Sequence, residues 1–489
     1  MSSFPPSIQT AEHVDACDVF AQLFPLLARH DACPSRQKRA ILKSAQAFDA
    51  KITTARDLVL TRGKIPAALA EAVITALQSG IDPDSASQEA FALLLGIDRA
   101  FAGLQPFASD DHDALDPYRD RLWQENRLDS GKAAPAVVLP RRGGQLRAPM
   151  QPERLLDEFE HLLFVSEGRK VDYAVAHPQD DMSIEQLRDR ADLKIACVPF
   201  LGSYSELQIS SVPFAKGVDC YRIQPDNVLA RWDARIDRVL KQLDSKGADF
   251  LVLPELALSD DLLKLWKHKL QQRSYKAPVS DSRANPGWVL AGSGGIGLSK
   301  KGELPPNRAV LLFRDGRTVM EQDKMSPFDM NANMVVRWQL DSHLGNKDIL
   351  EGMCAGTIRR IRDLRAGRVA ILVCEDHGRP IQMVSHLAEY EPSLIFVPIF
   401  SEPIRRFFWE HNGAREQVIT MGASVVVANS CAVPVPPDTA KMARKNYGTC
   451  MAAWPVEKSP GYLSTETRIS RFPKIPDPEV ITYFDIPLS

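Results

Sequence analysis

The feature that most constrains the fold is a change of hydrophobic pattern near residue 190. Beyond it, short apolar runs rich in β-branched residues alternate with helix-like stretches. Runs of this kind are typical of strands that are buried on both faces of a sheet. We therefore predict an α/β domain over residues 191–489. The runs occupy residues 193–200, 250–253, 288–291, 309–313, 369–373, 394–397 and 424–428.

The chain before this change follows the helical period instead. Residues 65–80 have a proline near the first turn, apolar residues three and four positions apart, and a terminal glycine, which are signals of a helix and its end. Residues 87–104 carry a second such pattern. We predict a helical module over residues 1–126. Because residues 1–185 show no catalytic constellation, we expect this module to serve in packing or to bind a protein partner.

The segment between the two parts, residues 127–190, is predicted to be a linker with one connecting helix. From Arg127 to Pro152 the chain contains several glycines and prolines, which is a linker-like composition. The helix is expected from Glu153 to Glu167. The predicted organisation is thus a helical module, a linker and an α/β domain.

Composition limits the classes of function. The 489-residue chain is 44% hydrophobic and 25% charged, as globular proteins are, and its net charge of −2 argues against a nucleic-acid partner. The eight cysteines form no CxxC pair, which argues against a zinc ribbon and fits a reducing compartment. No apolar run reaches the ~18 to 20 residues of a membrane helix, and the start of the chain lacks the pattern of a secretion signal. We expect a cytoplasmic protein that does not enter a membrane.

Three polar residues occur where predicted strands end: Glu255, Lys324 and Cys374. In α/β folds, ligand sites gather beyond the carboxyl ends of strands. Taken singly, a cysteine in this place is usually a small core residue, and a glutamate or lysine is usually a solvated loop charge. Their order and sequence context together are more informative.

Over roughly residues 191–489, the chain resembles the nitrilase, or carbon–nitrogen hydrolase, superfamily. Order, spacing and local context agree for all three catalytic positions of that family. The segments that carry the resemblance are residues 247–255, ending in Glu255; residues 307–324, ending in Lys324; residues 367–376, containing Cys374; and residues 415–430, a helix and a strand that end in Asn429-Ser430.

The resemblance implies a four-layer αββα sandwich, preceded by the helical module. It implies that Glu255 is the general base, Lys324 the charge stabiliser and Cys374 the nucleophile. Family members often carry a second glutamate between the lysine and the cysteine, and Glu351 suits that role. The backbone amide of Glu375 is expected to hold an oxyanion together with the lysine. No cofactor or metal is implied, and two subunits are expected to pair as a homodimer or within a larger homo-oligomer.

The implied chemistry depends on the state of the cysteine. A free thiol has a pKa near ~8.5 and attacks only as the thiolate. A carboxylate can take its proton, while a neighbouring ammonium and a helix amino end favour the anion. Attack on an amide or carbamoyl compound would leave an acyl-enzyme, a thioester in the amide case, that water hydrolyses, whereas attack on a nitrile would pass through a thioimidate. The predicted function is therefore hydrolysis of a non-peptide carbon–nitrogen bond in a small molecule, with these three substrate classes left open.

One departure from the family concerns the substrate pocket. Lys324 and Cys374 are 50 positions apart, which is longer than expected, and the extra chain lies within residues 325–347. We expect this insertion, which contains Phe328, Trp338 and His343, to reshape the pocket. The stretch Arg405-Arg406-Phe407-Phe408-Trp409 is expected either to bind an acidic substrate group or to form an aromatic packing face.

Rival motifs fit less well. Residues 292–297 satisfy GxGxxG, but residues 298–306 cannot open a helix of useful length, so we interpret the motif as a tight turn and not as a dinucleotide site. The sequence GxxxxGK[ST] is absent, so a fused ATP-driven ligase is not supported by that motif.

Two other functions remain as alternatives. A Cys–His hydrolase would pair Cys374 with His377, His386 or His411, none of which has a clear orienting partner in the sequence. A non-catalytic, nitrilase-like scaffold would be recruited through the helical module, but the retained glutamate, lysine and cysteine argue against it. Rapid labelling of Cys374 by a small electrophile near neutral pH is expected of the enzyme and not of the scaffold.

Overall fold

The computed structural model divides the chain into two compact units. One comprises residues 1–144 and 149–169, and the other comprises residues 145–148 and 170–489. The structure describes residues 13–29, 36–62, 64–101, 137–140, 155–165, 171–176, 191–215, 218–276, 286–297, 304–379, 387–434, 447–459, 462–470 and 477–487.

The described part of the first unit consists mainly of helices, with two short pairs of antiparallel strands. The two predicted helices are present as α4 and α5. Helix α4 ends at Gly80, which has the left-handed φ of 63° that favours glycine after a helix, and α5 is capped by the side chain of Asp82. The helices are α1 (Ala16–Arg29), α2 (Arg36–Lys43), α3 (Gln46–Arg62), α4 (Ala67–Ser79) and α5 (Pro83–Ala100); strand β1 (His13–Asp15) pairs with β2 (Lys64–Pro66), and β3 (Val137–Pro140) pairs with β4 (Leu162–Val165).

The connecting helix predicted from Glu153 to Glu167 is wrong. The structure has instead a short 3₁₀ helix, η2 (Leu155–Glu158), followed by strand β4. The buried carboxylate of Asp98 on α5 accepts hydrogen bonds from the backbone N–H groups of residues 160–162, at 2.7 to 2.9 Å. Because a side chain takes these donors, they are not available for the bonds of a helix.

Three strands lie within the segment predicted as a linker. Strands β3 and β4 belong to the first unit, whereas β5 (Val171–Val175) pairs in parallel with β15 (Arg359–Leu364) of the second. Apart from residues 145–148, the second unit therefore runs from residue 170, whereas we predicted the α/β domain from residue 191.

The second unit contains two large mixed sheets, and all seven predicted runs contribute strands to them. Parallel pairs join β6 to β9 and β9 to β10 in one sheet, and β16 to β17 and β17 to β19 in the other. In spatial order, the six-stranded sheet is β12 (Thr318–Asp323), β11 (Asn307–Phe313), β10 (Trp288–Gly295), β9 (Phe250–Val252), β6 (Asp192–Cys197) and β23 (Thr482–Pro487). The seven-stranded sheet is β22 (Tyr462–Ile469), β21 (Cys450–Ser459), β19 (Ser424–Asn429), β17 (Leu394–Ile399), β16 (Gly367–Ile371), β15 and β5.

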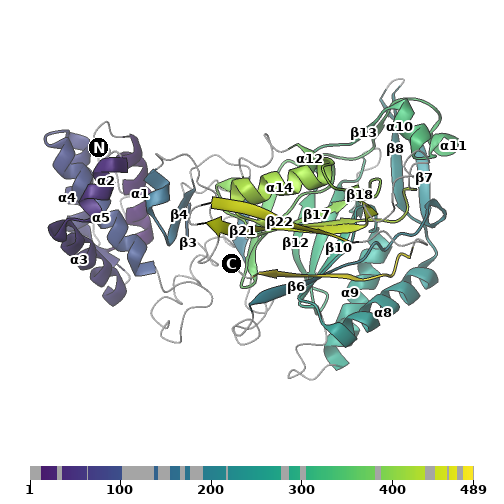
Figure 1. Cartoon of the computed structure of the whole chain (residues 1–489), viewed down its shortest axis with the longest axis horizontal. Coiled ribbons are helices and arrows are strands. Elements are labelled where there is room, and N and C mark those ends of the chain that lie inside the picture. The colour runs from purple at the N-terminus through teal and green to yellow at the C-terminus, as the bar shows by residue number, and fades with distance from the viewer. Residues whose placement is uncertain are drawn as a thin grey trace. The chain divides into compact units, whose positions relative to one another are not determined.

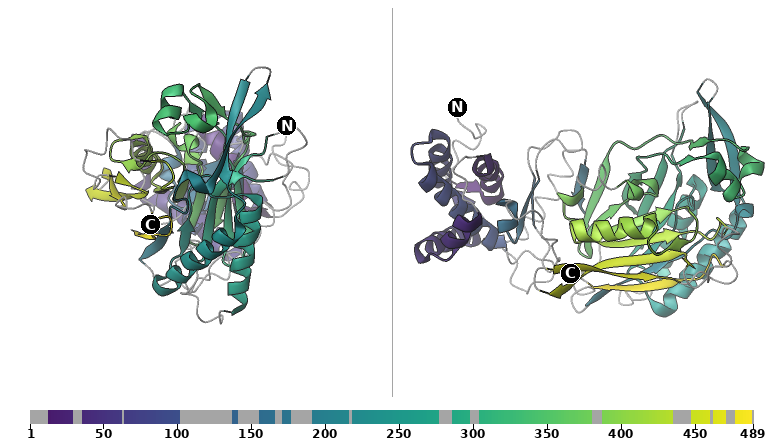
Figure 2. Two further views of the ribbon diagram at one scale, coloured as in Figure 1. Left: turned by 90° about the vertical axis from the view of Figure 1, so that its right-hand side faces the viewer. Right: turned by 45° about the horizontal axis from the view of Figure 1, so that its top comes forward.

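Apolar side chains hold these elements together. The rings of Phe250 on β9 and Phe396 on β17 are 5.0 Å apart, so the two sheets are in contact. Helices α8 (Leu229–Lys246) and α9 (Asp260–Lys276) bury Trp232 and Trp266 in one core with residues of the six-stranded sheet. Helix α14 (Trp409–Met421) packs along β19 and β21 of the other sheet (Figures 1 and 2). The arrangement confirms the predicted α/β class.

A smaller four-stranded sheet lies beside the large ones. Its spatial order is β13 (Asp329–Met330), β14 (Ile349–Glu351), β8 (Val218–Pro225) and β7 (Leu207–Ala215). The insertion at residues 325–347 supplies β13 and two short helices, α10 (Ala332–Arg337) and α11 (Asp341–Leu344). A two-stranded pair of β18 (Ile404–Arg405) and β20 (Tyr447–Gly448) completes the described strands of this unit.

Two glycines of β10 allow the loop after β9, which carries Glu255, to pack closely against β10. A Cβ atom on Gly292, whose φ is 79°, would lie 2.2 Å from the carbonyl oxygen of Pro254. A Cβ atom on Gly294 would lie 1.9 Å from the carbonyl oxygen of Leu258. The GxGxxG motif is therefore mostly strand, and not the tight turn that we predicted.

This close approach gives a stability prediction. Gly294→Ala should lower the free energy of unfolding by about 1–3 kcal/mol, because the new methyl group forces the backbone of the loop to move. Gly295→Ala is the matched control, since its Cβ would meet only ordinary contacts, the nearest at 3.4 Å, and should change stability by less than about 0.5 kcal/mol. Urea denaturation of both variants measures the difference. Equal losses would contradict the close-approach explanation.

Candidate active site

Four polar side chains meet in the interior of the second unit. The ammonium group of Lys324 donates to Oε1 of Glu255 at 2.8 Å and to Oε2 of Glu351 at 2.5 Å. The side-chain amide of Asn307 donates to both carboxylates at 2.9 Å. Lys324 is only 1% exposed and Glu255 only 3%. The structure therefore brings the predicted base, charge stabiliser and second glutamate together.

The end of β17 holds both the predicted base and the predicted nucleophile. The backbone N–H of Cys374 donates to the carbonyl oxygen of Pro398 at 3.0 Å, and that of Glu255 donates to Ile399 at 3.3 Å. The backbone N–H of Phe400 donates to Oε2 of Glu255 at 3.0 Å. One short segment of the seven-stranded sheet thus sets the position of a carboxylate that comes from the six-stranded sheet.

Cys374 occupies a sharp turn between strand β16 and the short helix α12 (Glu375–Gly378). Its φ is 48° and its ψ is −105°, a conformation that costs a residue with a side chain ~1–3 kcal/mol. The residue is 4% exposed. The hydrogen bond to Pro398 and the surrounding strands hold the turn in this strained form.

Asp376 ties this turn to the loop that carries the lysine. Its carboxylate accepts hydrogen bonds from the backbone N–H of Met325 at 3.0 Å and of Ser326 at 2.8 Å. Burial raises the pKa of Asp376 to about 6, although these hydrogen bonds and the charge of Lys324 oppose the shift. The side chain therefore connects the cysteine turn and the lysine loop directly.

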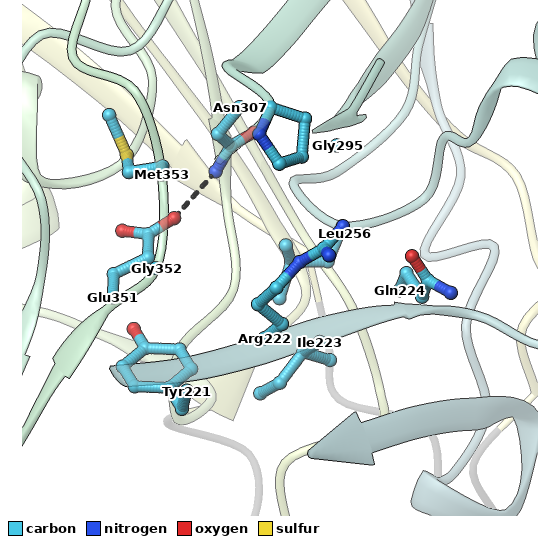
Figure 3. A pocket seen from close by; sticks show the side chains of 11 residues that line it. Tyr221, Arg222, Ile223, Gln224, Leu256, Gly295, Asn307, Glu351, Gly352 and Met353 are labelled. Carbon is cyan, nitrogen blue, oxygen red and sulfur yellow. Dashed lines mark hydrogen bonds between the residues drawn. The ribbon is translucent and has the colours of Figure 1, made fainter. Parts of the chain in front are cut away.

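A cavity of about 270 Å³ opens beside these groups. Its polar wall includes Glu255, Lys324, Glu351 and Cys374, and most of the remaining wall is apolar. The other lining residues are Tyr221, Ile223, Leu256, Phe328, Met330, Trp338 and Phe400. A second cavity of about 350 Å³ adjoins the first and shares four lining residues with it. Figure 3 shows this second cavity, including the hydrogen bond between Asn307 and Glu351.

Burial dominates the electrostatics of the candidate base. It raises the pKa of Glu255, a change that Lys324 opposes and Glu351 reinforces. Burial lowers the pKa of Lys324, but the charges of Glu255 and Glu351 outweigh it, so the pKa of the lysine stands well above its ordinary value. The lysine is therefore a permanent positive charge between two carboxylates.

The thiol of Cys374 responds to the same surroundings. Burial raises its pKa well above the ordinary value, the charge of Glu255 raises it further, and Lys324 acts in the opposite direction. This differs from our expectation that the lysine and a helix amino end would favour the thiolate. The favoured ground state pairs a neutral thiol with a carboxylate that can take its proton.

In the described part of the chain, no histidine is placed to act as the base for Cys374. Nε2 of His377 donates to the carbonyl oxygen of Glu410 at 3.0 Å, and Nδ1 accepts from the side chain of Gln417 at 2.8 Å. Both ring nitrogens of His377 are therefore occupied by groups other than Cys374. His411 lines neither cavity, and His386 lies outside the described residues.

The other predicted residues are placed as follows. The carboxylate of Glu375 pairs with Arg379 at 2.7 Å, so only its backbone amide is a candidate for the site. Phe328 and Trp338 of the insertion line the first cavity, as expected of residues that shape the pocket, whereas His343 does not. Trp338 is also buried in the core, and its Nε1 donates to Glu402 at 3.0 Å.

The stretch 405–409 lies away from both cavities. Phe407 is 70% exposed, and the guanidinium of Arg405 lies 3.4 Å from the centre of the Phe408 ring. None of these residues lines either cavity. The two cavities therefore give no support to the expectation that this stretch binds an acidic substrate group, and the alternative of an aromatic packing face is favoured.

Sequence reasoning missed two polar residues that build the site. Asn307 opens strand β11, whose continuation through β12 leads to Lys324, and Asp376 follows Cys374 by two positions. Both stand inside segments that carry the family resemblance, which is the signal that could have identified them. Their hydrogen-bond partners come from distant parts of the chain and could not be deduced from spacing.

Within the described ranges, no group of three or more His, Cys, Asp or Glu side chains is arranged to hold a metal ion. No helix in that part of the chain is long and apolar enough to cross a membrane.

Comparisons with known proteins find similarity at the level of structure. No model of a protein family and no curated protein sequence matches the chain. Nit3 of Saccharomyces cerevisiae, a member of branch 10 of the nitrilase superfamily, is 13% identical over 61% of this chain and 90% of that chain, with a TM-score of 0.36. An amidase from Nesterenkonia sp. is 15% identical over 61% and 92%, with a TM-score of 0.34. XC1258 from Xanthomonas campestris, a CN-hydrolase superfamily protein, is 15% identical over 61% and 91%, with a TM-score of 0.34.

Identities and TM-scores this low do not establish a shared activity, so the chemistry has to be derived from the side chains of the site. Nit3 and XC1258, which are described as members of the nitrilase and CN-hydrolase superfamilies, and the amidase each match 61% of this chain.

Proposed function

We propose that this protein hydrolyses a small-molecule amide through a covalent intermediate on Cys374. The observation that carries the proposal is a buried ammonium group held between two carboxylates, in the wall of a cavity that the cysteine also lines. Burying three charged groups is costly, and strongly perturbed pKa values in a cavity are typical of functional sites. We further propose that the α/β domain forms the four-layer αββα sandwich expected from the resemblance.

Glu255 acts as the general base. Its carboxylate lines the same cavity as the thiol of Cys374, its charge raises the pKa of that thiol, and it takes the proton as the sulfur attacks the amide carbon. A carbon–sulfur bond forms, and the electrons of the carbonyl double bond move to oxygen. The raised pKa of Glu255 makes it a stronger base than an exposed glutamate, and a catalytic pKa closer to the working pH suits proton transfer.

Lys324 stabilises the negative oxygen. Its charge is fixed by Glu255 and Glu351, so no reorganisation is needed when the oxyanion forms. We expect the backbone N–H of Glu375, next to Cys374, to be a further donor. When the oxyanion collapses, the carbon–nitrogen bond breaks, and the nitrogen takes the proton from Glu255 and leaves as ammonia or an amine.

The remaining thioester is hydrolysed by the same groups. Glu255 accepts a proton from water while the water oxygen attacks the acyl carbon. The carbon–sulfur bond then breaks, the acid leaves, and the sulfur regains a proton. Glu351 and Asn307 do not touch the reacting atoms in this scheme; they hold the lysine and the base in place.

The size and wall of the cavity limit the substrate. Eleven described residues line the cavity, and Phe328, Met330 and Trp338 give its wall an apolar side. We therefore expect small acyl groups, and not peptides, to bind there. A nitrile would be attacked by the same thiolate but would give a thioimidate, which has a different mass from the thioester.

A first prediction from this scheme separates the roles of Cys374 and Glu255. Cys374→Ala should abolish both ammonia release and the covalent adduct, because no other described cysteine and no described serine or threonine lines that cavity. Glu255→Gln keeps the shape of the side chain but removes the base, and should slow turnover by about 10²–10⁴. Ammonia release and intact mass spectrometry with a panel of amides, carbamoyl compounds and nitriles measure both effects.

The adduct mass distinguishes a thioester from a thioimidate. Near-normal turnover in Glu255→Gln on a substrate that requires Cys374 would show that the base is misassigned. If no compound gives an adduct or ammonia, the scaffold function gains support.

A second prediction concerns the pH dependence of the thiol. The charge of Glu255 raises the pKa of Cys374 and Lys324 lowers it, so Glu255→Gln should move the thiol pKa down and Lys324→Met should move it up. Alkylation rates with iodoacetamide over a pH series measure both shifts, with Cys374→Ala supplying the background from the other cysteines. Lys347→Met, which removes an exposed lysine paired with Asp219, should leave the profile as in the wild type. Shifts in the same direction for both site variants would contradict the electrostatic assignment.

A further inference from the structure

The second cavity extends the candidate active site outward. It shares Tyr221, Ile223, Leu256 and Glu351 with the catalytic cavity. A molecule with its reacting group beside Cys374 and a chain of a few bonds would therefore extend into the second cavity. The chemistry of that cavity then bears on which molecules bind.

Arg222 is the one cationic side chain that lines the second cavity. It lies on strand β8, and Figure 3 shows its side chain in the space between Glu351 on one side and Gln224 on the other. Among the described residues, none forms an ion pair or a side-chain hydrogen bond with its guanidinium. Several other arginines of the same unit do have acidic partners; they are Arg231, Arg235, Arg308 and Arg368.

Two glycines leave the space around this arginine open. A Cβ atom on Gly295 would lie 3.6 Å from Nη2 of Arg222, and one on Gly352 would lie 3.2 Å from its Cγ. Both glycines line the cavity. Larger residues at these positions would narrow the space beside the guanidinium.

Glu351, the acidic residue that lines the same cavity, already has hydrogen-bond partners within the protein. Oε1 of Glu351 accepts from Asn307, and Oε2 accepts from Lys324 and from the backbone N–H of Phe328. Glu351 therefore has its hydrogen bonds inside the protein, and the guanidinium of Arg222 is left to pair with a ligand.

We propose that Arg222 binds a carboxylate of the substrate, so that the preferred substrates are amides that also carry a carboxylate a few bonds away. This proposal rests on the proposed function, since it assigns the remote end of the molecule that Cys374 attacks. A guanidinium pairs with a carboxylate through two parallel hydrogen bonds, which gives direction as well as affinity. The single positive charge of the cavity matches the single charge of such a group.

A different role for Arg222 would be to balance charge. Glu255, Glu351 and Lys324 together carry one excess negative charge, which a nearby arginine would offset. In that case, loss of the arginine would impair charged and neutral substrates alike. The preference between a charged amide and its neutral isostere separates the two roles.

The test uses monoamides of succinic, glutaric and adipic acids, each paired with a neutral amide in which a methyl ketone replaces the carboxylate. Wild-type protein should give a higher kcat/KM for at least one acid than for its ketone partner. Arg222→Met should lower that preference about tenfold to hundredfold, as expected for the loss of a hydrogen-bonded charged group. Arg222→Lys should keep part of it, because it retains the charge but not the two parallel donors.

Arg406→Met is the matched control, since Arg406 is exposed and lines neither cavity, and it should keep the wild-type preference. Arg222→Gln replaces the methionine variant if that variant does not fold. An unchanged preference in the Arg222 variants, an equal loss in Arg406→Met, or a wild-type preference for the ketones would overturn the proposal.

A binding measurement keeps this proposal distinct from the proposed function. Cys374→Ala should bind a carboxylated amide more tightly than its ketone partner by calorimetry, and adding Arg222→Met should remove the difference. If the wild type hydrolyses none of the amides but the binding difference appears, the proposed function fails while the carboxylate site stands. If hydrolysis depends on Cys374 but binding shows no such difference, the carboxylate site fails alone.

Discussion

The site is organised around the ammonium group of Lys324, which is buried between Glu255 and Glu351. A lysine in the interior is tolerated only when its charge is matched, and here two carboxylates and the amide of Asn307 complete the match. The lysine and these three residues come from four different strands or strand ends, in the six-stranded and the four-stranded sheet. The positions of those strands are therefore constrained by the need to satisfy one charge.

Close backbone packing and one buried carboxylate hold these side chains in the positions that the arrangement requires. The close approach at Gly292 and Gly294 seats the loop that carries Glu255. Asp376 joins the cysteine turn to the loop that carries the lysine. Burial and the charge of Glu255 make the ground state one in which the thiol keeps its proton, so that the proposed chemistry begins with a proton transfer to Glu255.

Part of this could be predicted from the sequence. The short apolar runs identified the strands because a strand buried on both faces needs that composition, and the resemblance pointed to Glu255, Lys324 and Cys374, which the structure brings to one cavity. The helix expected at residues 153–167 failed because Asp98, far away in the sequence, takes its backbone donors. The direction of the shift in the pKa of Cys374 was missed for a related reason: the depth of burial is set by tertiary packing. Arg222 gave no signal, since an arginine in a strand becomes informative only when its partners are known.

The origin of the site residues in the two sheets has a consequence for folding. Glu255 and Lys324 follow strands of the six-stranded sheet, while Cys374 follows a strand of the seven-stranded sheet, and the contact of Phe250 with Phe396 lies where the sheets meet. Neither sheet alone contains all three residues of the proposed triad. A compact intermediate with both sheets formed but not yet docked would have native secondary structure and no functional site, so recovery of activity during refolding would report the moment at which the sheets join.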